Sequence, residues 1–330
     1  MSQDFESTRS AATAGPTGRR PFRFGAELEE PFEGMNWAES AQRLEALGYS
    51  TLFTWDHFSE GGWAPIASMA AAAAVTTELK LSTGVFCIDF RHPAVLAREL
   101  ATIDVLSEGR LEVGLGAGYQ LMDYRPTGIE MDPPGVRVSR LMEYVAILRG
   151  LFAEGPFSFE GEQFTITELD GTPKPFRPGG PPIYIGAGGK RMLTFAARNA
   201  DIIGVNRLLP ISDGTAPPRS MENAVTEEID KKFAWIREAA GPRFEDLTFQ
   251  SLVRVAQITD DPGGVAEELS GPLRISPEEV LESPFFLLGS VEEIAERLFE
   301  RRERWGYSYY TVSRDQAVDF APIVEHLSGR

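Results

Sequence analysis

The sequence predicts an α/β fold, a (β/α)8 TIM barrel, on three observations. The chain has 330 residues, 42% of them hydrophobic, which is enough to bury one large core. Short apolar runs alternate with amphipathic stretches along the chain, as they do in βα units. Eight such apolar runs are present, and eight strands separated by helices favour a closed barrel over an open, doubly wound sheet.

Four apolar runs in the first half of the chain each precede a predicted helix. In order, the pairs are RFGAEL before 36–47, STLFTW before 65–75, LKLSTGVFCI before 93–106, and LEVGLG before 137–152. Gly48 is suited to end the first of these helices, because glycine readily takes the left-handed conformation found after a helix. Pro93 is suited to the first turn of the third.

The second half of the chain supplies the other four strands. PIYIGAGG precedes 190–199, DIIGVN precedes 221–240, LTFQSLVRVAQI precedes 291–305, and SYYTV completes the set. Two segments do not fit the repeat and are expected to be insertions, one around 154–181 with the hairpin-like FSFEGEQFTIT and one around 260–290. The sequence thus predicts a single barrel domain over residues 21–330, after a disordered tail over residues 1–20.

Composition excludes several classes of function. The formal net charge is −17 and only five residues are lysine, which argues against nucleic acid and against anionic membrane surfaces as partners. One cysteine, Cys87, allows no disulfide framework, and no apolar stretch of about 20 residues is present to span a bilayer. The first residues lack the apolar segment of a signal peptide, so a cytoplasmic location is expected.

The residues to inspect are those at the end of each apolar run, because barrel chemistry gathers at the carboxyl ends of the strands. TLFTWDHF ends in Asp56 and His57, LSTGVFCIDF contains Gly84, and GLGAGY ends in Tyr119. Gly84 permits close approach of a flat ligand to the main chain. The alternatives are that Asp56 caps a helix, that Gly84 marks a bulge, and that Tyr119 is a packed aromatic ring. Asn206, at the end of DIIGVN, is either a polar contact or a turn residue.

The fifth run gives a candidate phosphate site. In PIYIGAGGKRML, Gly186, Gly188 and Gly189 stand directly before a helix that begins with Lys190 and Arg191. Binding of an anion is favoured here by the free amides at the helix start, by the positive end of the helix dipole and by the two cations. The spacing is not that of a Walker loop. The alternative is a tight turn followed by solvated cations.

Together, five motifs resemble the bacterial luciferase-like monooxygenase superfamily and, within it, the oxidoreductases dependent on coenzyme F420. They are TWDHF, LSTGVFCIDFRHP, SEGRLEVGLGAGY, PPIYIGAGGKRML and AARNADIIGVN, and the resemblance covers about residues 22 to 325. It implies a TIM barrel with insertions, hydride transfer at C5 of the deazaflavin, a small-molecule substrate and a homodimer.

The resemblance also implies residue roles. His57 corresponds to a histidine that acts in proton transfer beside the deazaflavin ring, oriented by Asp56, and Tyr119 is a second catalytic candidate. Gly84 and Val85 match a position where the family often has a cis peptide bond. The implied cofactor-binding residues are Asp56, His57, Gly84, Val85, Phe86, Cys87, Gly186, Ala187, Gly188, Gly189, Lys190 and Asn206, and no metal is implied.

The sequence departs from the F420-dependent glucose-6-phosphate dehydrogenases at several positions. Tyr119 stands where those enzymes have a proton-donating glutamate, Met122 replaces an asparagine, and the lysines that hold a sugar phosphate have no counterparts. We therefore expect another substrate, reduced at an activated C=C or C=N bond. The residues expected to form a large apolar pocket for it are Phe58, Trp63, Met122 and Tyr124.

Two alternative functions stay open. In an FMN-dependent luciferase-like monooxygenase, FMN would replace the deazaflavin, and the motifs do not separate the two cofactors because both carry a tricyclic ring and a phosphate. The other alternative is a non-catalytic ligand-binding barrel.

Overall fold

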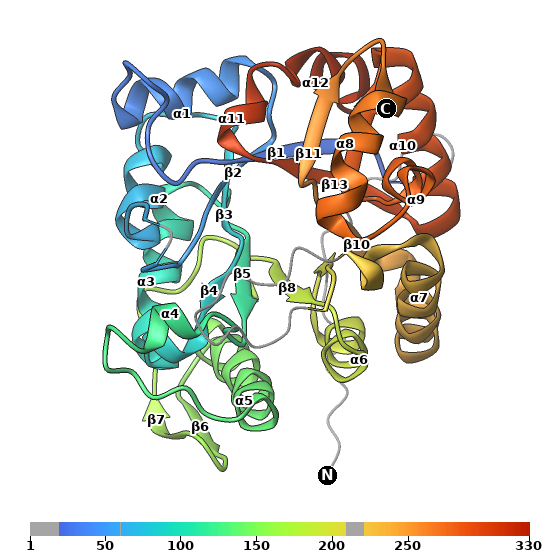
Figure 1. Cartoon of the computed structure of the whole chain (residues 1–330). Helices are drawn as coiled ribbons and strands as arrows, with labels where there is room; N and C mark the ends of the chain where they lie inside the picture. The colour runs from blue at the N-terminus through green and yellow to red at the C-terminus, as the bar shows by residue number, and fades with distance from the viewer. Residues whose placement is uncertain (1–19, 60, 209–220) are drawn as a thin grey trace.

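The computed structural model describes residues 20–59, 61–208 and 221–330. The predicted tail, residues 1–20, lies outside the described residues except for Arg20. Within the described residues, nine parallel strands form one sheet, in the order β3-β2-β1-β13-β10-β9-β8-β5-β4. Figure 1 shows these strands arranged around a centre, with helices on the outside.

The nine strands occupy eight barrel positions. Their bounds are β1 (Arg23–Glu27), β2 (Thr51–Thr54), β3 (Lys80–Thr83), β4 (Phe86–Cys87), β5 (Val113–Gly116), β8 (Ile183–Ala187), β9 (Ile202–Val205), β10 (Thr248–Leu252) and β13 (Tyr307–Val312). β3 and β4 are two parts of one strand position, separated by a cis peptide bond between Gly84 and Val85, as the resemblance implies. A bridge between Leu81 of β3 and Leu111, two residues before β5, closes the sheet. The predicted barrel is confirmed.

Helices follow the strands as the sequence predicts. The helices are α1 (Trp37–Ala46), α2 (Pro65–Ala73), α3 (Pro93–Leu106), α4 (Leu121–Tyr124), α5 (Pro134–Phe152), α6 (Lys190–Asn199), α7 (Thr226–Ala240), α8 (Pro262–Leu273), α9 (Pro277–Glu282), α10 (Val291–Trp305), α11 (Arg314–Ala317) and α12 (Ala321–Leu327). Capping boxes fix three of the starts, at Asn36 with Glu39, at Ser276 with Glu279 and at Ser290 with Glu293.

The run LTFQSLVRVAQI is divided, where the sequence predicts one strand. Val253 still donates to the carbonyl of Thr311 in β13, at 2.8 Å, but Arg254 donates to the carbonyl of Phe285, at 2.7 Å. From that point β11 (Val255–Ile258) leaves the barrel and pairs in parallel with β12 (Phe286–Gly289). The chain between them forms α8 and α9. The segment around 154–181 contains the antiparallel hairpin of β6 (Phe157–Glu160) and β7 (Thr165–Leu169).

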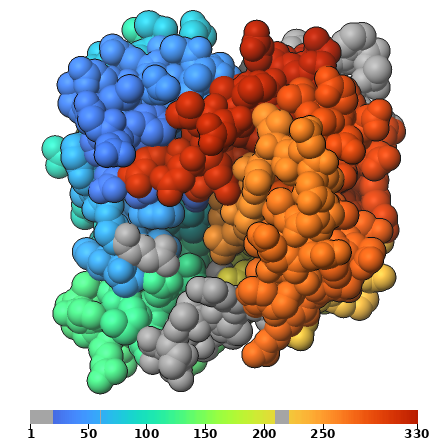
Figure 2. All heavy atoms as spheres, turned by 45° about the horizontal axis from the view of Figure 1, so that its top comes forward, coloured from blue at the N-terminus to red at the C-terminus, as the bar shows by residue number. Residues whose placement is uncertain are grey.

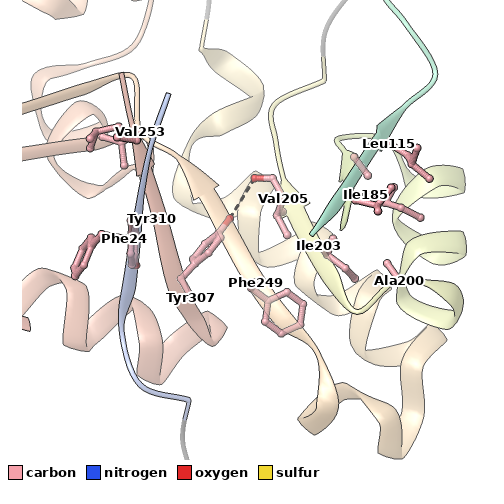
Figure 3. Packing of buried hydrophobic residues seen from close by; sticks show 14 of the residues in the cluster. Phe24, Leu115, Ile185, Ala200, Ile203, Val205, Phe249, Val253, Tyr307 and Tyr310 are labelled. Atoms are coloured by element: carbon pink, nitrogen blue, oxygen red, sulfur yellow. Dashed lines mark hydrogen bonds between the residues drawn. The ribbon is translucent and has the colours of Figure 1, made fainter. Parts of the chain in front are cut away.

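The core lies both outside and inside the barrel. Between the sheet and its helices, Phe24, Phe249 and Tyr310 pack as Figure 3 shows, and the Tyr307 hydroxyl donates to the carbonyl of Val205 at 3.3 Å. Inside, the rings of Phe53, Tyr184 and Tyr309 pack together, and all three residues are buried. The barrel interior is therefore filled below the strand ends.

We predict that Gly114→Ala lowers the free energy of unfolding by about 1–3 kcal/mol, because β5 passes directly against β3 at this residue. A Cβ on Gly114 would lie 1.9 Å from the carbonyl oxygen of Thr83, which belongs to the backbone and has no room to move aside. Urea denaturation measures the effect. Gly263→Ala is the control, because its Cβ would meet only an Asp261 oxygen at 3.8 Å. Equal stability of the two variants would contradict the prediction.

Candidate functional site

A cavity of about 510 Å³ opens at the carboxyl ends of the barrel strands. This volume lies within the usual range for sites that bind small molecules. Figure 2 shows the molecule hollowed between its blue and cyan N-terminal segments and its orange C-terminal segments. The predicted site residues that line the cavity are Asp56, His57, Gly84, Val85, Cys87, Tyr119, Gly186, Ala187, Gly188, Gly189, Lys190 and Asn206.

Phe86 is the one predicted site residue that does not line the cavity. Its side chain is 1% exposed and packs in the core, with the Arg91 guanidinium 5.4 Å from the ring centroid. Neighbouring side chains in a strand point to opposite faces, so Val85 and Cys87 face the cavity and Phe86 faces away from it.

His57 is held by a carboxylate that the sequence analysis did not identify. Its Nδ1 lies 2.5 Å from Oδ2 of Asp123, which α4 supplies. The other oxygen, Oδ1, accepts from the amides of Phe58 and Ser59 and from the Ser59 hydroxyl, each at 2.8 Å. The side chain of His57 is 17% exposed and that of Asp123 only 3%. The imidazole is therefore partly accessible while its partner is buried.

Asp56 does not orient His57, and that prediction is wrong. Oδ2 of Asp56 accepts instead from Arg91, at 2.6 Å, and from the amide of Cys87, at 3.2 Å. Burial raises the pKa of Asp56, and the nearby Arg91 guanidinium offsets part of that rise. Asp56 and His57 are adjacent in an extended segment, so their side chains diverge. Asp56 ties the end of β2 to β4 and the segment after it.

The large hydrophobic residues that line the cavity differ from those expected. Phe58, Trp63 and Met122 are 59%, 50% and 39% exposed and do not line the cavity. Tyr124 does line it, and its hydroxyl donates to Asp89 at 2.8 Å. Tyr119 reaches the cavity as predicted, with its ring centroid 5.7 Å from that of His57. An apolar pocket made by all four expected residues is therefore not present.

We predict that Cys87 reacts slowly with iodoacetamide at neutral pH. Burial raises the pKa of its thiol to about 12, and the side chain is 8% exposed. The reactive thiolate is then on the order of 10⁻⁴ of the population or less near pH 8, and it grows as the pH rises. Mass spectrometry follows the label cleanly because the chain has one cysteine. Protein unfolded in urea is the control, and equally fast labelling of the folded protein would contradict the prediction.

The glycine-rich end of the cavity has the features of an anion site. Gly189 is the N-cap of α6 and offers no side-chain cap, so the first amides of the helix have no intrahelical acceptor. A Cβ on Gly188 would lie 2.5 Å from the carbonyl oxygen of Arg207, so only glycine fits here. Lys190 is exposed, and the Arg191 guanidinium donates to Gly135 O at 3.0 Å and Ser139 Oγ at 2.9 Å on α5.

Asn206 joins the glycine-rich end of the cavity to β8. Its backbone N–H donates to the carbonyl of Ala187 at 2.8 Å, and its backbone carbonyl accepts from Nζ of Lys232 at 2.8 Å. Lys232 also donates to the carbonyl of Asn223 at 2.9 Å, and burial lowers its pKa to about 8. This lysine, which sequence reasoning missed, fixes the segment that follows β9.

Charged residues missed by the sequence analysis also line the cavity, among them Glu27, Asp123, Arg207 and Arg254. Arg207 directly follows the predicted strand DIIGVN, so the rule on strand ends could have identified it. Across the described ranges, no group of three or more His, Cys, Asp or Glu side chains is arranged to hold a metal ion. No helix in those ranges combines the length and the apolar character needed to cross a bilayer.

Comparison with known proteins agrees with this architecture. Residues 21–225, more than half of the chain, match the family model described as luciferase-like monooxygenase. The chain belongs to the luciferase-like monooxygenase family. A relative from Amycolatopsis mediterranei, named F420-dependent glucose-6-phosphate dehydrogenase, is 33% identical over 179 residues, which cover 52% of this chain and 53% of the relative.

Two further proteins extend the comparison. A Kribbella flavida protein with the same name is 30% identical over 261 residues, which cover 76% of this chain and 73% of that protein. The matched segment thus spans about half the length of the first relative and about three quarters of the second. The coenzyme F420-dependent tetrahydromethanopterin reductase from Methanopyrus kandleri has a TM-score of 0.70 at 17% identity, covering 94% of this chain and 100% of that one, which is a likeness of fold.

Proposed function

We propose that the protein is an oxidoreductase that works with coenzyme F420 on a small organic substrate. The observation that carries the proposal is that His57 and the glycine pair Gly188 and Gly189 open into the same cavity. This shared lining supports the proposal, in which His57 handles the proton and the glycine pair faces the phosphate of the cofactor. The names of the relatives from Amycolatopsis mediterranei and Kribbella flavida support F420 as the cofactor.

The residues present fit such a group. The cavity, about 510 Å³, has room for a three-ring heterocycle. Gly188 leaves its backbone bare where a side chain would collide with Arg207, and the uncapped start of α6 offers amides to a phosphate. Gly188, Gly189 and Lys190 would hold the phosphate, and Val85 and Cys87 would flank the ring.

When bound, coenzyme F420 supplies the ring carbon C5, which gives or takes a hydride. The chain has to bind the substrate, exclude water and handle one proton. His57 is the proton-handling group, because a ring nitrogen can both accept and donate near neutral pH. Tyr119, whose ring lies beside that of His57, is the second candidate.

We propose further that the substrate is reduced at an activated C=C or C=N bond. By the resemblance, Tyr119 corresponds to the proton-donating glutamate of the glucose-6-phosphate dehydrogenases, and a tyrosine hydroxyl can protonate the electron-rich centre left by hydride addition. Enones and imines are therefore the compounds to assay first, with glucose 6-phosphate as the comparison. Faster turnover of glucose 6-phosphate than of every enone and imine would contradict this substrate class.

Cofactor titration tests the assignment. We expect tight, saturable binding of F420 and weak binding of FMN, followed by quenching of cofactor fluorescence or by calorimetry. Preference for FMN would favour a flavin-dependent monooxygenase instead. Binding of neither would favour a non-catalytic ligand-binding barrel. A homodimer and a cytoplasmic location stay predictions, and light scattering after size-exclusion chromatography measures the oligomeric state.

A further inference from the structure

We propose that Asp123 is the positioning residue for His57, and that it holds the imidazole with Nδ1 protonated so that Nε2 exchanges the proton with the substrate. The role in turnover rests on the proposed function. The tautomer itself does not, because it follows from hydrogen bonds within the chain.

Asp123 is an acceptor only. Three donors converge on Oδ1, namely the amides of Phe58 and Ser59 and the Ser59 hydroxyl, and Gln120 in turn donates to that hydroxyl. Burial alone would raise the pKa of Asp123, but the hydrogen bonds from His57 and Ser59 outweigh it, so the pKa is lowered. An ionised carboxylate has no proton to donate. The hydrogen in the 2.5 Å contact between Oδ2 and Nδ1 therefore belongs to the imidazole.

This assignment fixes the state of the second ring nitrogen. In neutral imidazole one nitrogen donates and the other accepts, and the partner of one decides the role of the other. With Nδ1–H directed at Asp123, Nε2 carries the lone pair and is the nitrogen left for the cavity that His57 lines. The groups around the ring are Asp123 from α4, Tyr119 from the loop after β5, and Trp55 and Asp56 from the end of β2.

In this proposal a single atom, Nε2 of His57, gives and takes the proton in both directions of the reaction. In the reductive direction the bound cofactor would supply the hydride, and the substrate would take its proton from Nε2 of the His57 imidazolium. His57 returns to its neutral form with Nδ1–H still bonded to Asp123. In the oxidative direction Nε2 takes the substrate proton, and the buried carboxylate of Asp123 stabilises the resulting imidazolium.

Asp123→Asn gives a sharp test because it should reverse the tautomer. The three donors at Oδ1 require an acceptor there, so the amide oxygen takes that place. The amide NH₂ then faces Nδ1, which can only accept, and the ring proton moves to Nε2. The overall shape of the side chain is unchanged, but the lone pair that the substrate would meet is lost.

The experiment reads the tautomer by nitrogen-15 NMR of histidine-labelled protein without cofactor. The chain has three histidines, so His57→Gln identifies the signal of interest by its loss. We expect the Nδ1–H form in the wild type, the Nε2–H form in Asp123→Asn, and the Nδ1–H form in the control Asp56→Asn. Nε2–H in the wild type would overturn the proposal even if Asp123→Asn does not fold. Loss of the Nδ1–H form in Asp56→Asn alone would return the role to Asp56.

Steady-state kinetics then test the role in turnover. We expect Asp123→Asn to lower kcat on the order of 10²- to 10⁴-fold, as removal of a general acid or base does, with little change in KM or in cofactor affinity. A reversed tautomer with unchanged kcat would overturn the catalytic part. If the protein proves not to use F420, the proposed function fails, while the NMR result still decides whether Asp123 sets the state of His57.

Discussion

His57→Gln is expected to lower kcat on the order of 10²- to 10⁴-fold, the range typical of general acid and base catalysis. Glutamine cannot exchange a proton near neutral pH, yet its amide can still donate to Asp123 as Nδ1 of His57 does. The buried carboxylate therefore keeps a partner and the fold should be preserved. Single-turnover kinetics with the reduced cofactor and an enone measure the loss.

The matched control is His92→Gln, because His92 caps α3 and does not line the cavity. We expect wild-type turnover from this variant and an unfolding midpoint close to wild type from both. Wild-type turnover from His57→Gln would remove His57 from the mechanism and move the proton to Tyr119.

Gly188→Ala is expected to weaken cofactor binding roughly 5- to 150-fold. A Cβ at this residue would lie 2.5 Å from the carbonyl oxygen of Arg207 and 3.0 Å from Cα of Leu208. All of these are backbone atoms, so either the segment after β9 or the start of α6 must shift. Overpacking of this kind costs about 1–3 kcal/mol, which corresponds to that range of affinity when the cost falls on the bound state. Fluorescence titration with F420 measures it.

Gly189→Ala is the graded comparison for Gly188→Ala. Its Cβ would lie 3.4 Å from the flexible end of Leu208, an ordinary contact, and the backbone has φ −98° and ψ 155°, which alanine adopts. We expect a smaller loss of affinity than for Gly188→Ala, and none for the distant Gly263→Ala. Wild-type affinity in Gly188→Ala would mean that the cofactor phosphate does not bind at the start of α6.

Most of the barrel and much of the cavity wall could be predicted from sequence for a physical reason. Parallel strands end at the same rim, so residues that close separate apolar runs, such as His57, Tyr119 and Gly188, meet in space although they are far apart in the chain. The hydrophobic periodicity predicts the strands, and the residues at the strand ends then predict which side chains line the cavity.

The partner of His57 could not be found in this way. Asp56 is adjacent to it in sequence, whereas Asp123 lies 66 residues away on a one-turn helix whose direction no pattern reveals. Periodicity also could not divide LTFQSLVRVAQI, because its apolar character continues through Arg254 while its backbone changes partner. Residue type is the sole ground for expecting Phe58 and Trp63 in a pocket. Both are exposed, and hydrophobic residues are common on protein surfaces.

The segment from β11 to β12, with α8 and α9 between them, forms one side of the cavity and lies outside the barrel sheet. These two strands satisfy each other's backbone, and the residues at their entrances, Arg254 and Phe285, belong to the cavity lining. Insertions within this segment would reshape the opening, and a hydrogen bond ties its far end to a barrel strand, where the Ser251 hydroxyl of β10 donates to the carbonyl of Pro284 at 2.9 Å. Changes in this segment would therefore alter one side of the cavity, while His57 and the glycines before α6, which lie on other elements, keep their places.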